Sequence, residues 1–353
     1  MKIAVALSGG ADSLASLLFL KDRGYDLFPF HARLVAGNDQ QKQTEEQLSL
    51  ICQNLGLSLY VMDLTADFEQ KIINPFINSY LNGLTPNPCA LCNRQIKFGL
   101  IIDRLKDLGV PCMATGHYAR ISRERESLSL WRAKDKTKDQ SYFLSMVPIN
   151  IFKEVVFPLH ETSKALALDF LKQNNISPPV KKESNEVCFI RSDYRDFISS
   201  RVSKSLPGHP GPVTDRSGAV LGRHQGLWRY TQGQRRGLGI AHHHPLYVLG
   251  KDHKTNTLIV GGQEELLTGS CLAGQLNLHA DPDFWPEKVF VQTRYRQNAG
   301  QATVQIHSSQ MLISFSRPRD IPAPGQVAAV YSGQGQVLGA GIIENAEYES
   351  ACL

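Results

Sequence analysis

The stretch "KIAVALSGGADSLASLLFL", residues 2–20, decides the fold of this chain. Its apolar run at residues 3–7 is typical of a buried strand, and residues 13–23 are typical of a helix. The turn between them is "SGGADS" at residues 8–13. It places backbone N–H groups at the positive end of that helix, where such groups bind anions. Its glycines let the backbone approach a bound anion closely. The stretch therefore predicts a strand, a phosphate-binding turn and a helix.

Short strands and helices alternate from this stretch to about residue 115, which is typical of a parallel α/β sheet. The further strands expected there are 26–34, 57–61 and 112–115, and the further helices are 45–55 and 96–108. After a Pro- and Gly-rich stretch at 199–213 the pattern shortens to period two, as in strands. We predict three domains, which are an α/β nucleotide-binding domain at 1–192, a small central domain at 193–270, and a barrel or sandwich of five or six strands at 271–353.

The composition is that of a globular protein, with 42% hydrophobic and 20% charged residues in a chain of 353. No apolar run approaches the roughly 20 residues of a membrane helix, so we expect no membrane association. The first strand begins at once and leaves no room for a signal peptide, so we expect a cytoplasmic protein. Its seven cysteines, an odd number, then argue against a disulfide framework. The net charge of +5 is compatible with a polyanionic partner such as RNA.

The glycine-rich turn differs from both common phosphate loops, because it lacks the Gly-Lys-Ser/Thr ending and the GxGxxG spacing. It resembles the PP-loop of the ATP pyrophosphatases, which split ATP between the α and β phosphates. The structural alternative is a turn in which Ser13 or Asp12 only caps the helix. The resemblance implies that ATP, with Mg²⁺, is bound by Ala6, Leu7, Ser8, Gly9, Gly10, Ala11, Asp12 and Ser13.

Two cysteines, Cys89 and Cys92, form a CxxC pair in "TPNPCALCNRQIKFG", residues 85–99, where a Pro-rich turn opens a helix. The helix dipole is expected to lower the pKa of such a thiol and to favour a nucleophile or a metal ligand. A third cysteine, Cys188 in "ESNEVCFI", is expected to meet the pair over the ATP site. A CxxC pair alone is also typical of half a zinc site. The cysteines expected only to pack are Cys52, Cys112, Cys271 and Cys352.

Seven segments occur in the order found in the bacterial tRNA-specific 2-thiouridylase family, which the chain resembles over nearly its whole length. They are "SGGADS" (8–13), "TPNPCALCNRQIKF" (85–98), "ATGHYAR" (114–120), "KDQSYFL" (138–144), "CFI" (188–190), "YTQGQRRGLGI" (230–240) and "TRYRQ" (293–297). The resemblance implies a PP-loop domain, a central tRNA-binding domain and a C-terminal β-barrel. It also implies a monomer that thiolates C2 of the wobble uridine in the anticodon stem-loop of tRNAs for Lys, Glu and Gln. The reaction would pass through a uridine adenylated at O2, with sulfur from a cysteine desulfurase or a relay protein.

The resemblance implies roles for single residues as well. Cys92 and Cys188 would carry the sulfur, and Ala32 and Gly116 would contact the ATP. The residues implied to contact the RNA are Asn87, Pro88, His117, Lys138, Asp139, Gln140, Arg294, Tyr295 and Gln326. Without the family, residues 138–140 are equally typical of a solvated turn, residues 294–295 of an ordinary strand pair, and His117 of a histidine satisfied at a strand end.

Two motifs of the central domain are interpreted from their residue types alone. The "GQRRGLG" motif at 233–239 offers two adjacent arginines and flexible glycines, which suit phosphate contacts whose affinity falls with salt. The triplet at 242–244, three consecutive histidines, is not expected to bind a metal, because neighbouring side chains in a loop should not all face one ion.

The chain departs from the family at Cys89, where many members carry Asp. This leaves two routes for sulfur. In one, a persulfide on Cys188 donates sulfur and Cys92 reduces it. In the other, Cys89, Cys92 and Cys188 bind a 4Fe-4S cluster that delivers sulfide, and the same thiols would also hold zinc. The segments "HARLVAGNDQQ" (31–41) and "ESNEVCFI" (183–190) also differ from the family, which bears on the adenine contacts, the tRNA set and the sulfur donor.

Two rival functions remain open on the sequence. A PP-loop ligase or amidotransferase acting on a small molecule would explain the glycine-rich turn and leave Cys92 and Cys188 idle. A nucleotide-gated RNA-binding protein would use the C-terminal strands and leave the same thiols idle. Release of pyrophosphate that depends on tRNA separates both from a thiolase.

Overall fold

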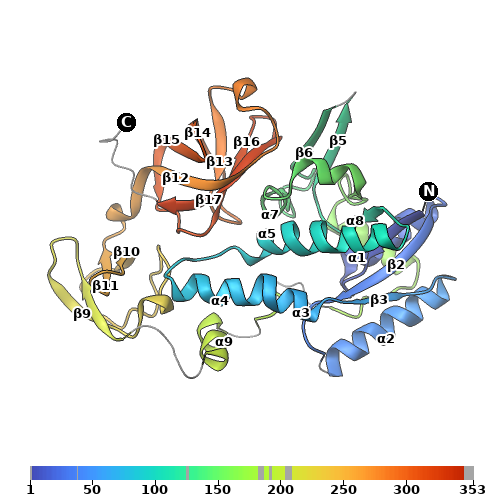
Figure 1. The fold of residues 1–353 in the computed structure, drawn as a ribbon, viewed down its shortest axis with the longest axis horizontal. Coiled ribbons are helices and arrows are strands. Elements are labelled where there is room, and N and C mark those ends of the chain that lie inside the picture. Colours follow the sequence, from blue (N-terminus) through green and yellow to red (C-terminus); the bar gives the residue numbers. More distant parts are fainter. Residues whose placement is uncertain are drawn as a thin grey trace.

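A computed structural model of the protein describes residues 2–37, 39–124, 127–181, 187–190, 193–202 and 209–345. Three sheet systems follow one another along the chain: a parallel sheet, a four-stranded sheet and a closed barrel. Figure 1 shows the parallel sheet and its helices at one end, the four-stranded sheet at the other, and the barrel above the long helices that join them. The prediction of an α/β domain followed by two strand-rich domains is confirmed.

The N-terminal sheet is parallel throughout and has the order β3-β2-β1-β4-β7. The strands are β1 Lys2–Ala6, β2 Asp26–Arg33, β3 Tyr60–Asp63, β4 Cys112–Ala114 and β7 Val155–Val156. The strand order reverses between β1 and β4, and ligands of such sheets bind beyond the carboxyl ends of the strands at this reversal. The "SGGADS" turn follows β1 and the "ATGHY" segment follows β4, so both lie at that place.

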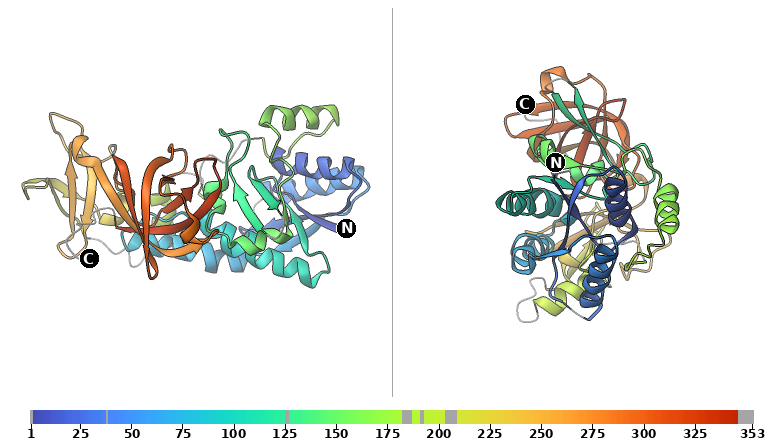
Figure 2. Two further views of the ribbon diagram at one scale, coloured as in Figure 1. Left: turned by 90° about the horizontal axis from the view of Figure 1, so that it is seen from above. Right: turned by 90° about the vertical axis from the view of Figure 1, so that its right-hand side faces the viewer.

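The helices of this domain cover the sheet, and two of them contain a π-helical stretch. They are α1 Ala11–Asp22, α2 Asp39–Asn54, α3 Thr65–Phe68 with η1 Glu69–Ile73 and α4 Asn74–Leu81, α5 Pro88–Cys92 with η2 Asn93–Leu100 and α6 Ile101–Asp107, α7 Ser141–Leu144, η3 Ile149–Glu154, α8 Lys164–Gln173 and α9 Tyr194–Arg201. The β5 Arg120–Glu124 and β6 Ser127–Trp131 hairpin lies outside the sheet. The sequence analysis missed α4 and this hairpin. Figure 2 shows α8 beside α1, and the ring of Phe170 in α8 stacks on that of Phe19 in α1 with centroids 4.5 Å apart.

The central sheet has the order β10-β11-β8-β9. Its elements are β8 Gly211–Thr214, β9 Val220–His224, η4 Leu227–Arg229, β10 Tyr247–Asp252, β11 Thr257–Gly261 and η5 Glu264–Leu266. The barrel closes in the order β12-β15-β14-β13-β16-β17. Its elements are β12 Leu267–Leu278, η6 Pro282–Phe284, β13 Val289–Gln292, β14 Gly300–His307, β15 Gln310–Asp320, β16 Val327–Tyr331 and β17 Val337–Asn345. Because β12 starts before residue 271, the first barrel strand crosses the boundary placed at 270; the boundaries themselves stay predictions.

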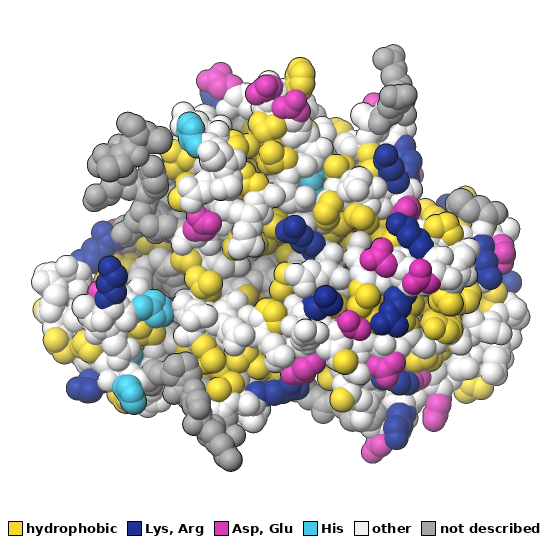
Figure 3. Space-filling view, viewed as in Figure 1, with side chains coloured by type: hydrophobic (Ala, Val, Ile, Leu, Met, Phe, Trp, Pro, Cys, Tyr) yellow, Lys and Arg dark blue, Asp and Glu magenta, His cyan; other side chains and the backbone are white. Residues whose placement is uncertain are grey.

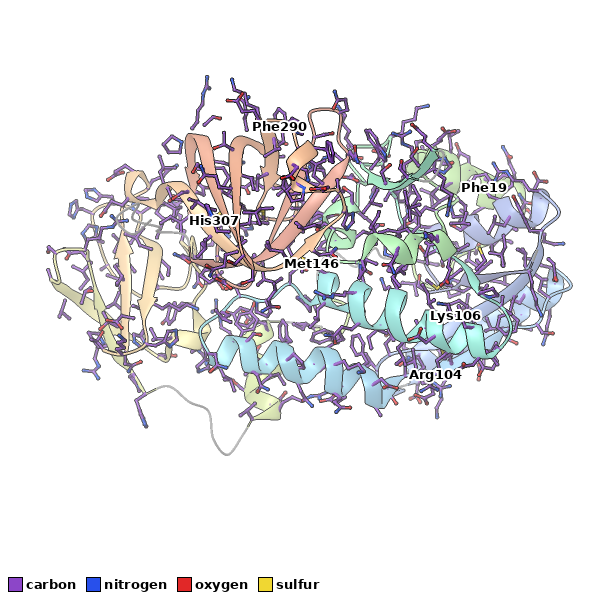
Figure 4. All side chains as sticks on the ribbon, turned by 45° about the horizontal axis from the view of Figure 1, so that its top comes forward. Phe19, Arg104, Lys106, Met146, Phe290 and His307 are labelled. Atoms are coloured by element: carbon purple, nitrogen blue, oxygen red, sulfur yellow. The ribbon has the colours of Figure 1, made fainter. Side chains whose placement is uncertain are left out.

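The barrel and the N-terminal domain share one hydrophobic core. Tyr142 and Met146, near α7, belong to the same buried cluster as Val327, Ala329 and Tyr331 of β16. Figure 4 labels Met146 where the barrel meets the domain below it. Packing continuous across the two domains fixes the barrel against α7 of the N-terminal domain.

Two features of the described part of the chain are the apolar character of its helices and the charges on one face of the molecule. No helix there has the length and apolar character needed to cross a membrane. On the face in Figure 3, Lys and Arg side chains lie among Asp and Glu over the N-terminal domain, so no single-sign field dominates that face.

A polar contact beneath the barrel joins the two domains. Asn277 donates from its side-chain amide to the carbonyls of Ser145 and Val147, at 2.8 and 3.0 Å. The Nε2 of His279 lies 2.9 Å from the same Val147 oxygen, and its buried Nδ1 has no hydrogen-bond partner. Burial therefore lowers the pKa of His279 to about 4.

The buried, neutral His279 predicts that the folded protein loses stability as the pH falls. The pKa of His279 is depressed, so its contribution to folding is complete above the ordinary value of 6.5 and is lost as the pH falls towards 4. The loss should reach roughly 3 kcal/mol. Thermal midpoints measured from pH 7 to 4 should fall less steeply for His279→Gln, which keeps an amide donor and does not titrate. Parallel pH profiles for the two proteins would show that another group is responsible.

Candidate active site

The glycine-rich turn is held by its own serines. The hydroxyl of Ser13 donates to the Gly10 carbonyl at 2.8 Å, and the backbone N–H of Ser8 donates to the Ser13 oxygen at 3.2 Å. Gly9 has a φ of +84°, a conformation that favours glycine. Gly10 is the N-cap of α1 and has no side-chain cap, so the alternative in which Ser13 or Asp12 caps this helix is wrong. The first N–H groups of α1 lack partners within the helix and suit an anion.

The segment after β4 lies directly against this turn. A Cβ atom added to Gly116 would come within 2.8 Å of the Asp12 carbonyl carbon and 2.9 Å of the Ser13 nitrogen. Only glycine leaves room for this contact. Gly116, implied by the resemblance to contact ATP, therefore lies beside the predicted phosphate site.

Two residues that the sequence analysis missed meet the side chain of Asp12. The hydroxyl of Tyr118 donates to one carboxylate oxygen at 2.8 Å, and Lys164 lies 2.8 Å from both oxygens. Tyr118 lies within the "ATGHYAR" segment, whereas Lys164, the first residue of α8, had no signal in the sequence. Lys164 and Asp12 thus form an ion pair beside the turn.

The segment at residues 31–41, one of the two that differ from the family, also borders the glycine-rich turn. His31, on β2, lies with Nδ1 2.7 Å from the carbonyl oxygen of Leu7, while its buried Nε2 has no hydrogen-bond partner. Ala32 follows it, half-buried on the same strand. Arg33 forms an ion pair with Glu45 of α2 at 2.6 Å.

The thiol pair lies on α5, whose start is built by Asn87 and Pro88. The side-chain oxygen of Asn87 accepts from the backbone of Ala90 at 3.1 Å as the N-cap. Pro88 occupies the first helical position, where its missing N–H costs nothing. Cys89 is half-buried and Cys92 is buried.

The barrel holds the chain that enters this helix. The amide of Gln326 donates to the carbonyls of Thr85 and Pro86 at 3.0 and 3.1 Å. The N–H of Thr85 donates to the Pro324 carbonyl at 2.8 Å. Gln326, implied to contact RNA, thus supports the thiol helix in this structure.

His117 and Lys97 connect the nucleotide side to the thiol side. His117 follows Gly116, and its ring lies 5.6 Å from that of Phe98 on η2. Burial, with the ammonium of Lys97 adding to it, holds the pKa of His117 well below its usual range, so the ring is neutral. Its Nδ1 lies 2.7 Å from the hydroxyl of Thr115. The sequence analysis missed Lys97.

The thiol pKa values contradict the sequence-based expectation. Burial raises the pKa of Cys92 to about 12 and raises the pKa of Cys89 and Cys188 as well, while the charge of Lys97 offsets a part. Cys92 ends α5 and is covered by protein, so loss of hydration outweighs the helix dipole.

Cys188 differs from the pair because the residue reaches the protein surface, although protein atoms around its thiol still remove enough water to raise its pKa. The next residue, Phe189, is buried, and its ring lies 5.7 Å from Phe68, 5.3 Å from Phe76 and 5.4 Å from Phe197. Cys188 is close enough to both other thiols to influence their pKa values. The aromatic contacts therefore hold the third cysteine beside the pair, at the protein surface.

The three thiols do not form a compact group suited to a single ion. Among the described residues, the group whose ligand atoms lie within 4.8 Å of one another is His242, His243 and His244. The expectation that these neighbouring histidines cannot face one ion is thus wrong for their geometry. A cluster distributes its ligands over separate iron atoms, so the looser set of cysteines stays a prediction for a 4Fe-4S group.

The predicted RNA residues at 138–140 are tied into the protein. Asp139 is buried, lies 2.7 Å from Arg132, and accepts from the hydroxyl of Ser141 at 2.9 Å. These bonds occupy its carboxylate, and contact of Asp139 with RNA stays a prediction. The side-chain oxygen of Gln140 accepts from the backbone of Tyr118 at 3.1 Å.

The two barrel residues implied to contact RNA differ in exposure. Arg294 is exposed, whereas the half-buried ring of Tyr295 lies 4.3 Å from that of Phe143. Lys138, next to the buried Asp139, is half-buried. Contact of these residues with RNA stays a prediction.

The other cysteines behave as packing residues where they are described. Cys52 and Cys271 are buried, and Cys112 is half-buried. Cys352 lies outside the described residues.

Three family models match the chain in sequence order. They are the tRNA methyl transferase HUP domain at residues 1–192, the tRNA methyl transferase PRC-barrel domain at 195–262 and the Aminomethyltransferase beta-barrel domain at 268–343. The tRNA-specific 2-thiouridylase MnmA of Nitratidesulfovibrio vulgaris (strain DSM 19637 / Miyazaki F) is 46% identical over 349 residues, covering 97% of this chain and 99% of the relative. That of Lawsonia intracellularis is 40% identical, covering 98% and 99%.

A solved structure matches more distantly. The U34-tRNA thiolase NcsA from Methanococcus maripaludis, with its 4Fe-4S cluster, covers 57% of this chain and 65% of its own, with a TM-score of 0.36 and 14% identity. This likeness is too low to support an inference about the site.

The contact between barrel and thiol helix predicts the effect of a small substitution. Gly325 has a φ of +91°, and a Cβ there would lie 3.0 to 3.1 Å from the backbone of Thr85. Gly218, with a φ of +89° and open space around it, is the matched control. Gly325→Ala should cost roughly 1–3 kcal/mol more than Gly218→Ala, because the backbone before the thiols must move.

Thermal unfolding and the rate of Cys89 alkylation measure this effect. The Gly325 variant should unfold earlier and alkylate Cys89 faster than the control. Equal behaviour of the two variants would mean that the barrel does not hold the entry to α5.

Proposed function

This chain belongs to the tRNA-specific 2-thiouridylase family, and we propose that it replaces the C2 oxygen of the wobble uridine in tRNA with sulfur, using ATP. The observation that carries the proposal is the contact path from the glycine-rich turn through Gly116 and His117 to the helix of the thiols. A pyrophosphate site next to cysteines suits activation of a carbonyl oxygen followed by attack of sulfur. The thiols favour sulfur transfer over the methyl transfer that two of the matching family models name.

The first step is adenylation of the uridine. The uridine O2 attacks the α-phosphorus of ATP, a phosphorus–oxygen bond breaks, and pyrophosphate leaves. The N–H groups at the start of α1 would stabilise the departing charge. We propose Mg²⁺ as the counter-ion of the phosphates, because the charge of Lys164 is already paired with the carboxylate of Asp12.

The second step is attack of sulfur at C2. The terminal sulfur of a persulfide on Cys188 bonds to C2, and AMP leaves with the former O2. The thiol of Cys92, once deprotonated, attacks the Cys188 sulfur, which frees the thiocarbonyl and forms a Cys92–Cys188 disulfide. An external thiol reductant then restores both cysteines. The exposure of Cys188 supports this route, because a sulfur-donating protein must reach the residue it loads.

A 4Fe-4S cluster is the second route for sulfur. The donor set fits, because three thiols from two segments leave one coordination position open. Cys89, Cys92 and Cys188 would hold the cluster, which when bound would supply an iron atom that carries sulfide to the uridine. In both routes the glycine-rich turn would bind the pyrophosphate, and the protein would shield the uridine base from solvent.

The proposed substrate, sulfur donor and cellular location are those of the family. We propose tRNAs for Lys, Glu and Gln, recognised at the anticodon stem-loop, as substrates, and a cysteine desulfurase or its relay protein as sulfur donor. A monomer acting in the cytoplasm would suffice for this reaction.

Incubation with ATP, Mg²⁺, a sulfur donor and tRNA-Lys transcript tests the proposal. Pyrophosphate release should depend on tRNA, and 2-thiouridine should appear by nucleoside mass spectrometry. Cys188→Ala should abolish 2-thiouridine and leave tRNA binding intact. Release of pyrophosphate without tRNA would instead favour a small-molecule ligase, and binding of tRNA without release an RNA-binding protein.

Cys89→Asp separates the two sulfur routes, because many family members carry Asp there. With the persulfide route the variant should keep activity within about tenfold of the parent. With the cluster route it should lose both bound iron and thiolation after anaerobic reconstitution. Cys271→Ala, which changes a buried barrel thiol, is the control for the loss of a cysteine as such.

A further inference from the structure

A hollow lined by three arginines lies between α9 and the central sheet. Arg195 of α9, Arg223 of β9 and Arg229 of η4 face it together with Gly237 and Gly239. Its volume of about 230 Å³ is below the roughly 300–1,000 Å³ of pockets for drug-sized ligands. We call it the arginine pocket, and its size suits a small group.

The positive charge of the arginine pocket is only partly neutralised by neighbouring groups. Among the described residues that line it there is no carboxylate. Arg195 lies 3.7 Å from Asp193, but its buried Nε has no hydrogen bond. Arg223 donates to the carbonyl of Pro210 at 3.3 Å, and the guanidinium of Arg229 lies 5.0 Å from the ring of Trp228. Guanidinium groups gathered in this way favour a phosphate, which several can bind at once.

The elements that carry these arginines are held in place. The hydroxyl of Tyr194, next to Arg195, donates to the carbonyl of Arg229 at 2.9 Å. The Tyr194 ring also stacks on that of Tyr80 in α4, with centroids 4.3 Å apart. Figure 1 shows α9 beside α4. The arginine pocket is therefore built on fixed elements of the central domain, and the stacking of Tyr194 on Tyr80 ties them to α4 of the N-terminal domain.

Gly237, Leu238 and Gly239 of the glycine loop close one side of the pocket. Gly237 and Gly239 have φ values of +76° and +69°, which glycine adopts without strain. The two arginines of the "GQRRGLG" motif are not among the lining residues. The cationic side chains come from three other segments, which the sequence alone did not bring together.

We propose that the arginine pocket binds a backbone phosphate of the tRNA substrate, away from the target uridine. The inference rests on the proposed function. Arg195 follows Cys188 by seven residues, a span of at most about 25 Å of extended chain, so the two sites can contact one RNA arm. Bound there, the phosphate would fix the RNA across the junction of the N-terminal and central domains.

The test is tRNA binding by the double variant Arg223→Gln, Arg229→Gln across a range of KCl concentrations. The slope of log K against log[KCl] should fall by about one unit, and Kd near 0.1 M salt should rise roughly tenfold. Lys254→Gln, which removes an exposed charge of the same domain, should change neither by as much. Thermal unfolding confirms folding, and the single variant Arg223→Gln serves if the double variant does not fold.

The outcomes separate the inference from its premise. If the parent protein does not bind tRNA, the proposed function fails and the inference with it. If the parent binds but the double variant keeps the parent's slope and Kd, only the phosphate pocket is overturned. Binding of inorganic phosphate to the parent, lost in the double variant while tRNA binding is unchanged, would assign the pocket to a free anion instead.

Discussion

The close contact between Gly116 and the first turn of α1 is the constraint on which the site depends. No side chain fits between them, so the segment after β4 is pressed against the glycine-rich turn after β1. This contact puts His117 beside the nucleotide side and, through its ring contact with Phe98, fixes the helix of the thiols. A parallel sheet whose order reverses at β1 and β4 supplies the two strand ends that make this possible.

Two further parts of the chain position the thiols: the barrel and the segment that contains Cys188. The barrel holds the chain before α5 through Gln326, and the aromatic contacts of Phe189 hold Cys188 near the same helix. The resulting thiols differ in environment, because Cys92 is buried and Cys188 is exposed. An exposed thiol suits loading by a donor, and a buried one suits a step shielded from solvent. In the proposed persulfide route, sulfur would therefore enter at the exposed Cys188 and be released with the help of the buried Cys92.

Much of the fold could be predicted from local sequence patterns. The features that could not be predicted depend on contacts between residues that are far apart in the sequence. The turn after β1, the parallel sheet and a C-terminal barrel or sandwich of five or six strands follow from spacing and periodicity in the sequence, and the family resemblance implied the barrel. Lys164 was missed because it meets Asp12 across 152 positions of the chain. The raised pKa of Cys92 and the burial of Asp139 also depend on packing, so the motif around each residue gave the wrong environment.

The central claim, that uridine O2 is activated as an adenylate, is tested most directly by following that oxygen. A tRNA transcript made from uridine labelled with ¹⁸O at O2 would be thiolated with unlabelled ATP, and the AMP analysed by mass spectrometry. The account predicts one ¹⁸O in AMP for each 2-thiouridine formed, because the oxygen leaves C2 attached to the phosphorus. Unlabelled AMP formed together with 2-thiouridine would contradict it.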